Sequence, residues 1–236
     1  MKGIFKLVLP AILISALLLP GSIFAKEKSL IVGGKNFTEQ LLLPELAGII
    51  LEQAGFDVTL KTGVGTAIAR KSLENAQIDL YYEYRGLAYA LFYKQKDKEN
   101  MTVPENVYSW VKKADSEKGL VWLDPVNFNN TYTLMMRKKE AEKLGIKSIS
   151  DLGAYVSKNP DKLIFALGAE FWERPDGFKG LMKTYNFNLP IKQVKKMSMG
   201  FTYQALQKKL VNSAAGFATD GRIAASGVVN LVDDKL

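Results

Sequence analysis

The chain has 236 residues with 32 lysines and arginines against 24 acidic residues, a formal charge of +8, and neither cysteine nor histidine. Without cysteine the chain cannot form disulfides, thiolate metal sites, a thiolate nucleophile or a lipid-modified N-terminal cysteine. Without histidine it lacks the usual general base and the commonest metal ligand, which excludes hydrolase triads and typical zinc sites. The basic residues are interspersed with acids, a pattern typical of a solvated surface rather than a nucleic-acid interface.

Residues 1–25 have the pattern of a secretory signal peptide. Lys2 and Lys6 precede an apolar run over 7–19, and the small residue Ala25 comes before a charged stretch. The apolar run is too short for a typical membrane span. The sequence therefore predicts cleavage after Ala25 and a soluble periplasmic protein, because no cysteine is present to carry a lipid. A retained N-terminal anchor is the alternative interpretation.

Strands and helices are predicted to alternate in the first half of the mature chain. Short apolar strands are expected at 29–33, 57–61 and 78–82. Between the first two strands, apolar residues at the spacing of one helical face predict a helix; they are Leu42, Leu46, Ile49 and Ile50. Pro44 either opens or bends this helix, and a second helix is expected at 67–75. This order predicts a parallel βαβ sheet, followed by a helical, polar stretch over 87–121.

The alternation resumes after residue 131. Strands are expected at 132–137, 163–167, 191–197, 214–219 and 228–232, and helices beginning at 150, after 177 and at 202. We therefore predict an α/β protein of two lobes, with 26–128 as the first lobe, 129–232 as the second, and 233–236 as the start of a second crossover. Two lobes without catalytic nucleophiles indicate a cleft that closes on a ligand.

A series of short motifs runs in order through nearly all of the mature chain. The motifs are VGGKNFTEQ at 32–40, KTGVGT at 61–66, IDLYYEY at 78–84, LDP at 123–125, NNTY at 129–132, EFWERPDG at 170–177, GFTYQAL at 200–206, TDGR at 219–222 and DDK at 233–235. With them the chain resembles the glycine betaine/choline/carnitine-binding proteins of ABC importers. This resemblance implies a periplasmic-binding-protein fold of type II, with two lobes joined by two crossovers and the ligand between them.

The resemblance also implies the residues of the site. In that family aromatic rings surround the quaternary ammonium, which attracts ring faces through cation–π contacts of about 0.5 to 2 kcal/mol each. Tyr84 and Tyr132 fall at the positions of such tyrosines, and Asn130 where a polar residue lies near the ammonium. Lys35 and Arg174 fall where cations hold a carboxylate. From pattern alone, without the resemblance, the tyrosines are interpreted as half-buried packing residues and the two cations as surface residues.

The sequence departs from the family pattern at several points. Leu87 replaces a threonine whose hydroxyl would meet a carboxylate, and Arg85 compensates only if it points into the cleft. Phe217 replaces a tyrosine but keeps the ring face. Relatives continue beyond the 233–236 segment and return to the first lobe with a further aromatic residue. We therefore expect one wall of the site to be missing, and apolar surface to be exposed on the first lobe.

Together these features predict the extracytoplasmic substrate-binding component of an ABC importer for quaternary ammonium osmolytes. The predicted ligand-binding residues are Lys35, Tyr84, Asn130, Tyr132, Arg174 and Phe217. We expect a monomer that docks on a membrane permease, with no cofactor, no metal, no nucleic-acid partner and no catalytic activity. The alternative is a truncated relic or interaction protein that contacts a partner without carrying a solute. The sequence does not select among glycine betaine, choline, carnitine and proline betaine.

Overall fold

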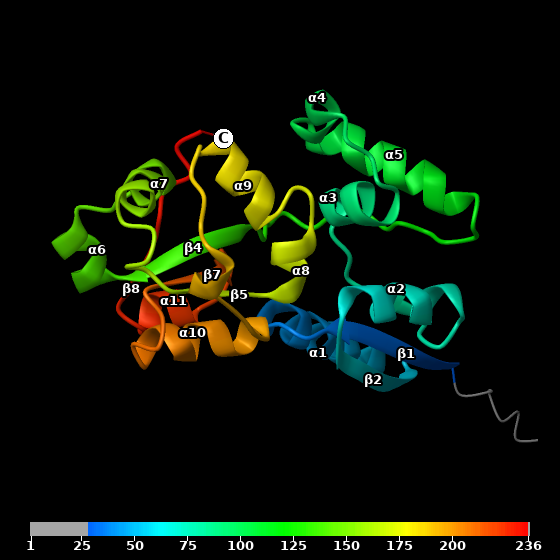
Figure 1. The fold of residues 1–236 in the computed structure, drawn as a ribbon. Helices are drawn as coiled ribbons and strands as arrows, with labels where there is room; N and C mark the ends of the chain where they lie inside the picture. The colour runs from blue at the N-terminus through cyan, green and yellow to red at the C-terminus, as the bar shows by residue number, and fades with distance from the viewer. Residues whose placement is uncertain (1–27, 236) are drawn as a thin grey trace, which may run out of the picture.

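The computed structural model describes residues 28–235, so the predicted signal peptide lies outside the described residues. The described chain forms two α/β lobes, each built on its own sheet (Figure 1). We call residues 28–126 lobe 1 and residues 131–235 lobe 2; the chain passes from one to the other at 127–130. Within this described part, no helix is both long and apolar enough to cross a membrane.

Lobe 1 contains a three-stranded parallel sheet in the order β2-β1-β3. Its strands are β1 (Lys28–Lys35), β2 (Phe56–Val64) and β3 (Leu80–Tyr81). Helix α1 (Thr38–Gln53) connects β1 to β2, and α2 (Thr66–Glu74) connects β2 to β3. The parallel βαβ arrangement predicted for this half is therefore confirmed.

The stretch after β3, predicted to be helical and polar, forms several helices. They are α3 (Arg85–Leu87), the π-helix η1 (Ala88–Phe92), α4 (Lys98–Met101) and α5 (Pro104–Ser116). A buried ion pair fixes α5 to α2, because Arg70 donates to both carboxylate oxygens of Asp115, at 2.8 and 2.5 Å. Asp115 also accepts hydrogen bonds from Tyr93 and from Trp122 Nε1. This cluster lies beside a small apolar core of Ala88, Tyr89, Val107 and Val111.

The apolar face predicted for α1 points away from the sheet. The buried residues of the helix are Gln40, Pro44, Ala47 and Gly48. The predicted face is instead exposed: Leu42 by 59%, Leu46 by 55%, Ile49 by 52% and Ile50 by 65%. Pro44 lies inside the helix rather than at its start. The apolar surface expected on the first lobe is thus confirmed, and α1 carries it.

Lobe 2 contains a five-stranded mixed sheet in the order β6-β5-β7-β4-β8. The strands are β4 (Tyr132–Arg137), β5 (Phe165–Leu167), β6 (Val194–Lys196), β7 (Ser213–Phe217) and β8 (Val228–Asn230). β5, β6 and β7 are parallel, whereas β4 runs antiparallel to β7 and β8. β4 is the first element after the chain arrives from lobe 1, and it is inserted between two strands that come later in the sequence.

Helices cover this sheet and complete a larger core. They are α6 (Lys138–Leu144), α7 (Ile149–Lys158), α8 (Ala169–Glu173), α9 (Phe178–Thr184), the 3₁₀ turn η2 (Ile191–Gln193), α10 (Met199–Gln207) and α11 (Arg222–Ala225). The strand predicted at 191–197 therefore begins as a 3₁₀ turn. Helix α7 begins at Ile149, one residue before the predicted start, and Ser148 caps it. The Ser148 hydroxyl accepts from the backbone N–H of Asp151, and the Asp151 side chain accepts from the backbone N–H of Ser148. This capping box satisfies two N–H groups at the helix start.

The segment predicted to begin a second crossover is bound to lobe 2. The Tyr185 hydroxyl donates to Asp233 and accepts from the backbone N–H of Lys235 at 2.9 Å. The backbone N–H of Ser150 donates to Asp234 at 3.1 Å. These contacts fix residues 233–235 against α7 and the end of α9.

Candidate ligand-binding site

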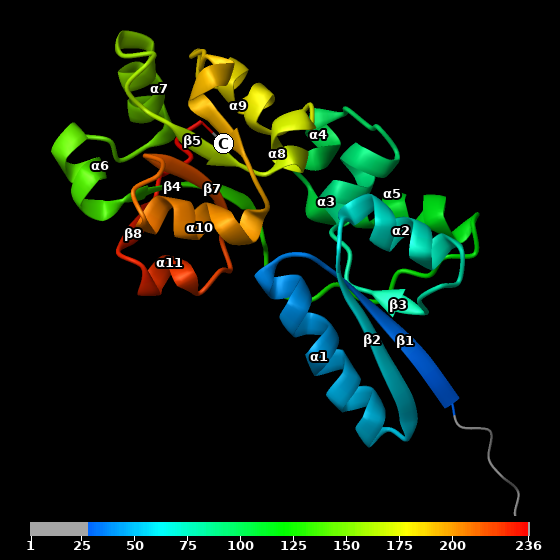
Figure 2. The ribbon, with the colours of Figure 1, turned by 60° about the horizontal axis from the view of Figure 1, so that its bottom comes forward.

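A cavity of about 1440 Å³ lies between the two lobes. Lobe 1 lines it with the turn after β1, the residues after β3 and the extended segment 119–126. Lobe 2 lines it with the start of β4, with α8, and with the residues at the ends of β5, β6 and β7. The carboxyl ends of the parallel strands thus border one cavity, which is where open α/β sheets bind ligands. Figure 2 shows the amino end of α1 pointing toward lobe 2.

Five aromatic rings meet in this cavity, and we call them the aromatic cluster: Phe37, Tyr84, Tyr132, Phe171 and Phe217. The ring centroids of Phe37 and Phe217 are 4.5 Å apart, and those of Tyr132 and Phe217 are 4.9 Å apart. Tyr132 stacks on Phe171 at 4.3 Å, and Phe37 lies 6.1 Å from Tyr84. The cluster therefore joins rings from both lobes and includes three predicted site residues.

The two tyrosines of the cluster are held by carboxylates. The hydroxyl of Tyr84 donates to Glu39 and accepts from Gln40 Nε2 at 3.1 Å. The hydroxyl of Tyr132 donates to Glu170 Oε1 at 3.3 Å. Burial and the bond to Glu39 raise the pKa of Tyr84, and burial and the charge of Glu170 raise the pKa of Tyr132. Both side chains are therefore neutral phenols at neutral pH, with the electron-rich ring faces that attract cations.

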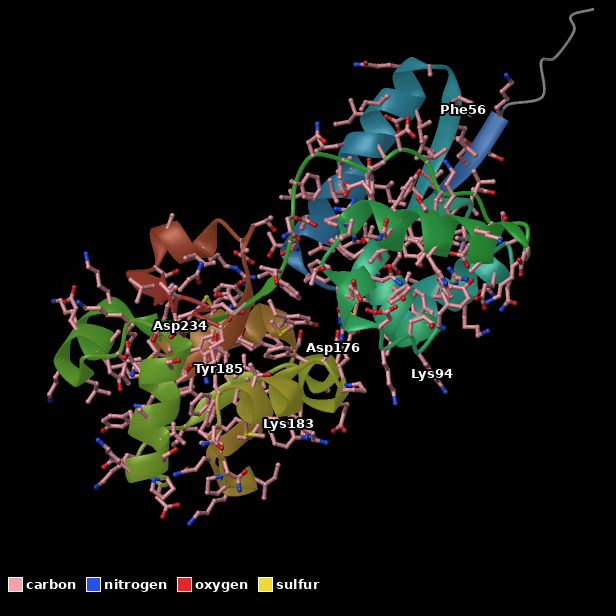
Figure 3. All side chains as sticks on the ribbon, turned by 90° about the horizontal axis from the view of Figure 1, so that it is seen from above. Phe56, Lys94, Asp176, Lys183, Tyr185 and Asp234 are labelled. Atoms are coloured by element: carbon pink, nitrogen blue, oxygen red, sulfur yellow. The ribbon has the colours of Figure 1, made fainter. Side chains whose placement is uncertain are left out.

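Arg174 also lines the cavity, where two carboxylates already contact it. Its Nε and Nη2 donate to Asp176 at 2.9 and 2.6 Å, and its Nη1 lies 3.7 Å from Glu170. Burial opposes the charge of this guanidinium, but the bonds to Asp176 outweigh it and raise the pKa of Arg174. Figure 3 shows Asp176 on the side of lobe 2 nearest lobe 1. Because a guanidinium carries five N–H donors, Nη1 can still donate to a ligand.

Lys35 is not among the residues that line the cavity. Its side chain is 1% exposed and forms an ion pair with Glu83 at 2.5 Å, beneath the rings of Tyr81 and Tyr84. Glu83 also accepts from the Tyr81 hydroxyl and from the backbone N–H of Tyr84. The structure therefore places Lys35 below the site, where it fixes the residues after β3. Its partner is 48 positions away, so the local motif did not reveal the pair.

The remaining predicted residues border the cavity. Asn130 lines it from the segment between the lobes, and its buried Oδ1 has no hydrogen-bond partner among the described residues. Phe217 lines it from the end of β7. Arg85 and Leu87, at the point where the sequence departs from the family pattern, are also lining residues. The structure thus brings together Tyr84, Asn130, Tyr132, Arg174 and Phe217, and leaves out Lys35.

Sequence reasoning missed two rings of the cluster, Phe37 and Phe171. Both occur inside motifs that carry the family resemblance, but neither has a spacing that distinguishes it from a core residue. The available signal was position, since Phe37 follows the carboxyl end of β1 and Phe171 closely follows that of β5. In the described part of the chain, no group of acidic side chains is arranged to hold a metal ion.

The fold and the cavity define a class: two-lobed α/β proteins that match the type II periplasmic binding proteins. Residues 28–236 match the family described as the substrate binding domain of ABC-type glycine betaine transport systems. The chain belongs to this family, and it is a transport binding protein rather than an enzyme.

Individual relatives agree with this assignment. A glycine-betaine-binding protein of Pseudomonas aeruginosa is 35% identical over 216 residues, covering 89% of this chain and 68% of the relative. The ergothioneine transport permease/ergothioneine binding protein EgtU of Helicobacter pylori is 32% identical, over 89% of this chain and 36% of the relative. The solved structure of apo YehZ from Escherichia coli matches with a TM-score of 0.59 and 32% identity, over 89% of this chain and 75% of that one.

Proposed function

We propose that the chain binds a quaternary ammonium solute in the cavity between its lobes, with the cationic group against the aromatic cluster. The observation that carries the proposal is the convergence of five rings from both lobes on one cavity. A trimethylammonium group donates no hydrogen bond, and each ring face attracts it by about 0.5 to 2 kcal/mol. Several rings together are therefore needed for useful affinity, and rings from both lobes couple binding to closure.

The polar groups of the cavity suit a solute that also carries a carboxylate. Arg174 can donate through Nη1, and Arg85 adds a second cation to the lining. Glycine betaine and carnitine have such a carboxylate, whereas choline does not. Leu87 removes one hydroxyl donor from this region, which reduces the advantage of a betaine over choline. The names of the relatives, which include binding proteins for glycine betaine and for ergothioneine, support the class of betaine ligands.

The transport role follows from the family and from the sequence. The signal-peptide pattern at 1–25 supports export to the periplasm. There the monomer would close over its solute and present the closed form to the membrane permease. The ligand contacts both lobes only in the closed form, so binding increases the closed fraction.

A thermal-shift titration tests the binding function. The mature chain starting at Lys26 is titrated with glycine betaine and with choline, from micromolar to tens of millimolar. A ligand at a hundredfold excess over its dissociation constant stabilises the folded form by about 2.7 kcal/mol, which raises the melting temperature by several degrees. The Tyr132→Ala variant should lose this shift. Tyr155→Ala is the matched control, because Tyr155 is partly buried in the core of lobe 2 and does not line the cavity.

The alternative function, an interaction protein that carries no solute, predicts a different result. A cooperative melt that neither solute shifts in the parent chain would reject the binding function and favour this alternative. If both Tyr132→Ala and Tyr155→Ala lose the shift, the loss reflects damage to the fold of lobe 2. The Tyr132→Ala result would then no longer support a ligand site at the aromatic cluster.

A further inference from the structure

The two lobes are joined by hydrogen bonds that converge on one side chain. Thr38, the first residue of α1, donates from Oγ1 to Asp220 Oδ2 at 2.8 Å. The same Oγ1 accepts from Arg222 Nη2 at 2.9 Å. Among the described residues, these two bonds are the side-chain hydrogen bonds that connect lobe 1 to lobe 2. A single hydroxyl of lobe 1 is therefore held by an acid and a base of lobe 2.

The lobe 2 side of this contact is rigid. Arg222 donates to Asp220 through Nε at 2.9 Å and through Nη2 at 2.6 Å, and through Nη1 to the carbonyl of Gly200 at 3.0 Å. The guanidinium carbon lies 4.0 Å from the centroid of the Tyr203 ring. Such a bidentate, stacked arginine is fixed in orientation. The pair therefore presents its carboxylate and guanidinium to the Thr38 hydroxyl in a defined geometry.

An aromatic contact continues this junction into the cavity. Phe37 precedes Thr38, and its ring stacks on Phe217 of β7 at 4.5 Å. Phe217 belongs to the same strand-end region as Asp220, whose backbone N–H donates to the carbonyl of Phe217 at 3.0 Å. Asp220 is also a negative charge at the amino end of a 16-residue helix, which the helix dipole favours. Hydrogen bonds, stacking and charge all join the amino end of α1 to the region after β7.

The described chain passes from lobe 1 to lobe 2 at 127–130. Noncovalent contacts between the lobes, such as this junction, contribute to their relative orientation. We propose that Phe37, Thr38, Phe217, Asp220 and Arg222 form an interlobe latch that holds the lobes closed before a ligand arrives. The latch makes Thr38 a positioning residue for ligand binding, since it fixes the distance between the rings contributed by lobe 1 and those contributed by lobe 2.

The effect of the latch on ligand affinity rests on the proposed function, whereas the contacts of the latch itself do not. A protein that is already closed pays less of its binding energy to close, and its apparent dissociation constant is the intrinsic one divided by the closed fraction. Weakening the latch should therefore raise the dissociation constant for glycine betaine. If the closed fraction falls tenfold, the dissociation constant rises about tenfold.

Distance measurement without ligand tests the latch directly. The chain has no cysteine, so spin labels at Lys94→Cys and Lys183→Cys report only the distance between the lobes; both residues are exposed, one on each lobe (Figure 3). In the ligand-free protein, Thr38→Val should lengthen and broaden the distance distribution, because valine keeps the shape but neither bond. Thr38→Ser, which keeps the hydroxyl, should restore the parent distribution. Thr59→Val, an exposed position on β2, is the matched control.

A second variant, on lobe 2, tests whether the change in distance comes from the interlobe contact and not from a local change in α1. Arg222→Gln should produce the same lengthening as Thr38→Val, with circular dichroism confirming that both variants remain folded. A Thr38→Val distribution that equals that of the parent would overturn the latch, whatever the titrations show. The two proposals can also fail separately. If the distances confirm the latch but the parent protein binds neither glycine betaine nor choline, the proposed function is rejected and the latch is retained.

Discussion

The two lobes have the same series of elements around a central strand, but their sheets differ in the strands added at the edge. In lobe 1 the series is β1, α1, β2, α2, β3, and in lobe 2 it is β5, α8 with α9, β6, α10, β7. Both sheets place the first strand of the series between the second and the third. In lobe 2, however, β4 enters from the other lobe and pairs with both β7 and β8. Among the described residues β3 pairs with β1 alone.

The same difference appears on the helices. In the order of elements, α1 is the counterpart of α8 and α9. The helix α7, which follows β4 and α6, contributes Leu152 and Val156 to one core with Trp172 and Phe178. The corresponding outer face of α1 carries exposed leucines and isoleucines. An apolar helical pattern therefore indicates a face that can pack against another element. Whether another element packs there depends on the rest of the fold.

The lobes consequently depend on different interactions. Lobe 2 has a large apolar core, whereas lobe 1 has a small one beside the Arg70–Asp115 ion pair. The predictions below test this contrast, and they are ordered from the largest expected effect to the smallest.

Removing the buried carboxylate of lobe 1 should have the largest effect. Asp115→Ala leaves the Arg70 guanidinium buried without its bidentate partner, and we expect a loss of about 3 to 5 kcal/mol. Urea unfolding followed by hydrogen exchange and mass spectrometry resolves the lobes, and lobe 1 peptides should lose protection first. Asp161→Ala is the matched control in lobe 2, because its ion pair with Lys192 is exposed. An equal loss in both variants would contradict the contrast between the lobes.

The same pair predicts how the stability of lobe 1 depends on pH. Burial alone would raise the pKa of Asp115, but the bonds from Arg70, Tyr93 and Trp122 lower it below its ordinary value of 3.8. A carboxyl whose pKa is lower in the folded state stabilises that state above its ordinary value and loses this effect as the pH falls through the folded one. Lobe 1 protection should therefore be constant near neutral pH and decline below about pH 4, and Asp115→Ala should flatten this decline.

The same leucine-to-alanine change on a helix of each lobe should give unequal losses. Leu152 of α7 is fully buried in the lobe 2 core, so Leu152→Ala should cost about 2 to 5 kcal/mol. Leu46 of α1 is more than half exposed, so Leu46→Ala should stay within about 0.5 kcal/mol of the parent. Both values come from urea unfolding of the purified variants. A Leu46→Ala loss as large as that of Leu152→Ala would show that something covers α1 in solution.

The helix caps should give an intermediate effect. Ser148→Ala removes the capping box of α7 and should cost about 1 kcal/mol. The amino end of α1 has no side-chain cap of its own. Ser150→Ala, two residues further along, is the control, since its hydroxyl takes no part in the box. Equal melting temperatures for Ser148→Ala and the parent would contradict the role of the cap.

A substitution on the exposed face of α1 should have the smallest effect on stability but should clearly reduce the exposed apolar surface. Ile50→Lys at an exposed position should alter the unfolding free energy by less than about 0.5 kcal/mol. It should nevertheless reduce the fluorescence of 8-anilinonaphthalene-1-sulfonate, a dye that binds exposed apolar surface. Ile191→Lys, equally exposed on lobe 2, is the control and should leave most of the dye signal. Unchanged dye fluorescence in Ile50→Lys would mean that the α1 face is covered.

Several features of the site were predictable from local sequence. Tyr84, Tyr132, Arg174 and Phe217 follow from motifs whose spacing matches the family, and each lines the cavity. Lys35 follows from the same reasoning but is buried with Glu83, because the chain after β3 brings a carboxylate beneath it. A motif specifies which residue type is present, whereas the partner of a charge depends on which distant segment arrives beside it.

The sequence by itself determined the family, the alternation of strands and helices, and three rings of the aromatic cluster. These features depend on local periodicity and on motifs, which can be recognised in the sequence without the three-dimensional structure. The tertiary structure decided that α1 exposes its apolar face, that Phe37 and Phe171 join the aromatic cluster, and that Thr38 meets Asp220 and Arg222. Those outcomes depend on contacts between residues up to 184 positions apart, and no local pattern encodes which distant surfaces will meet.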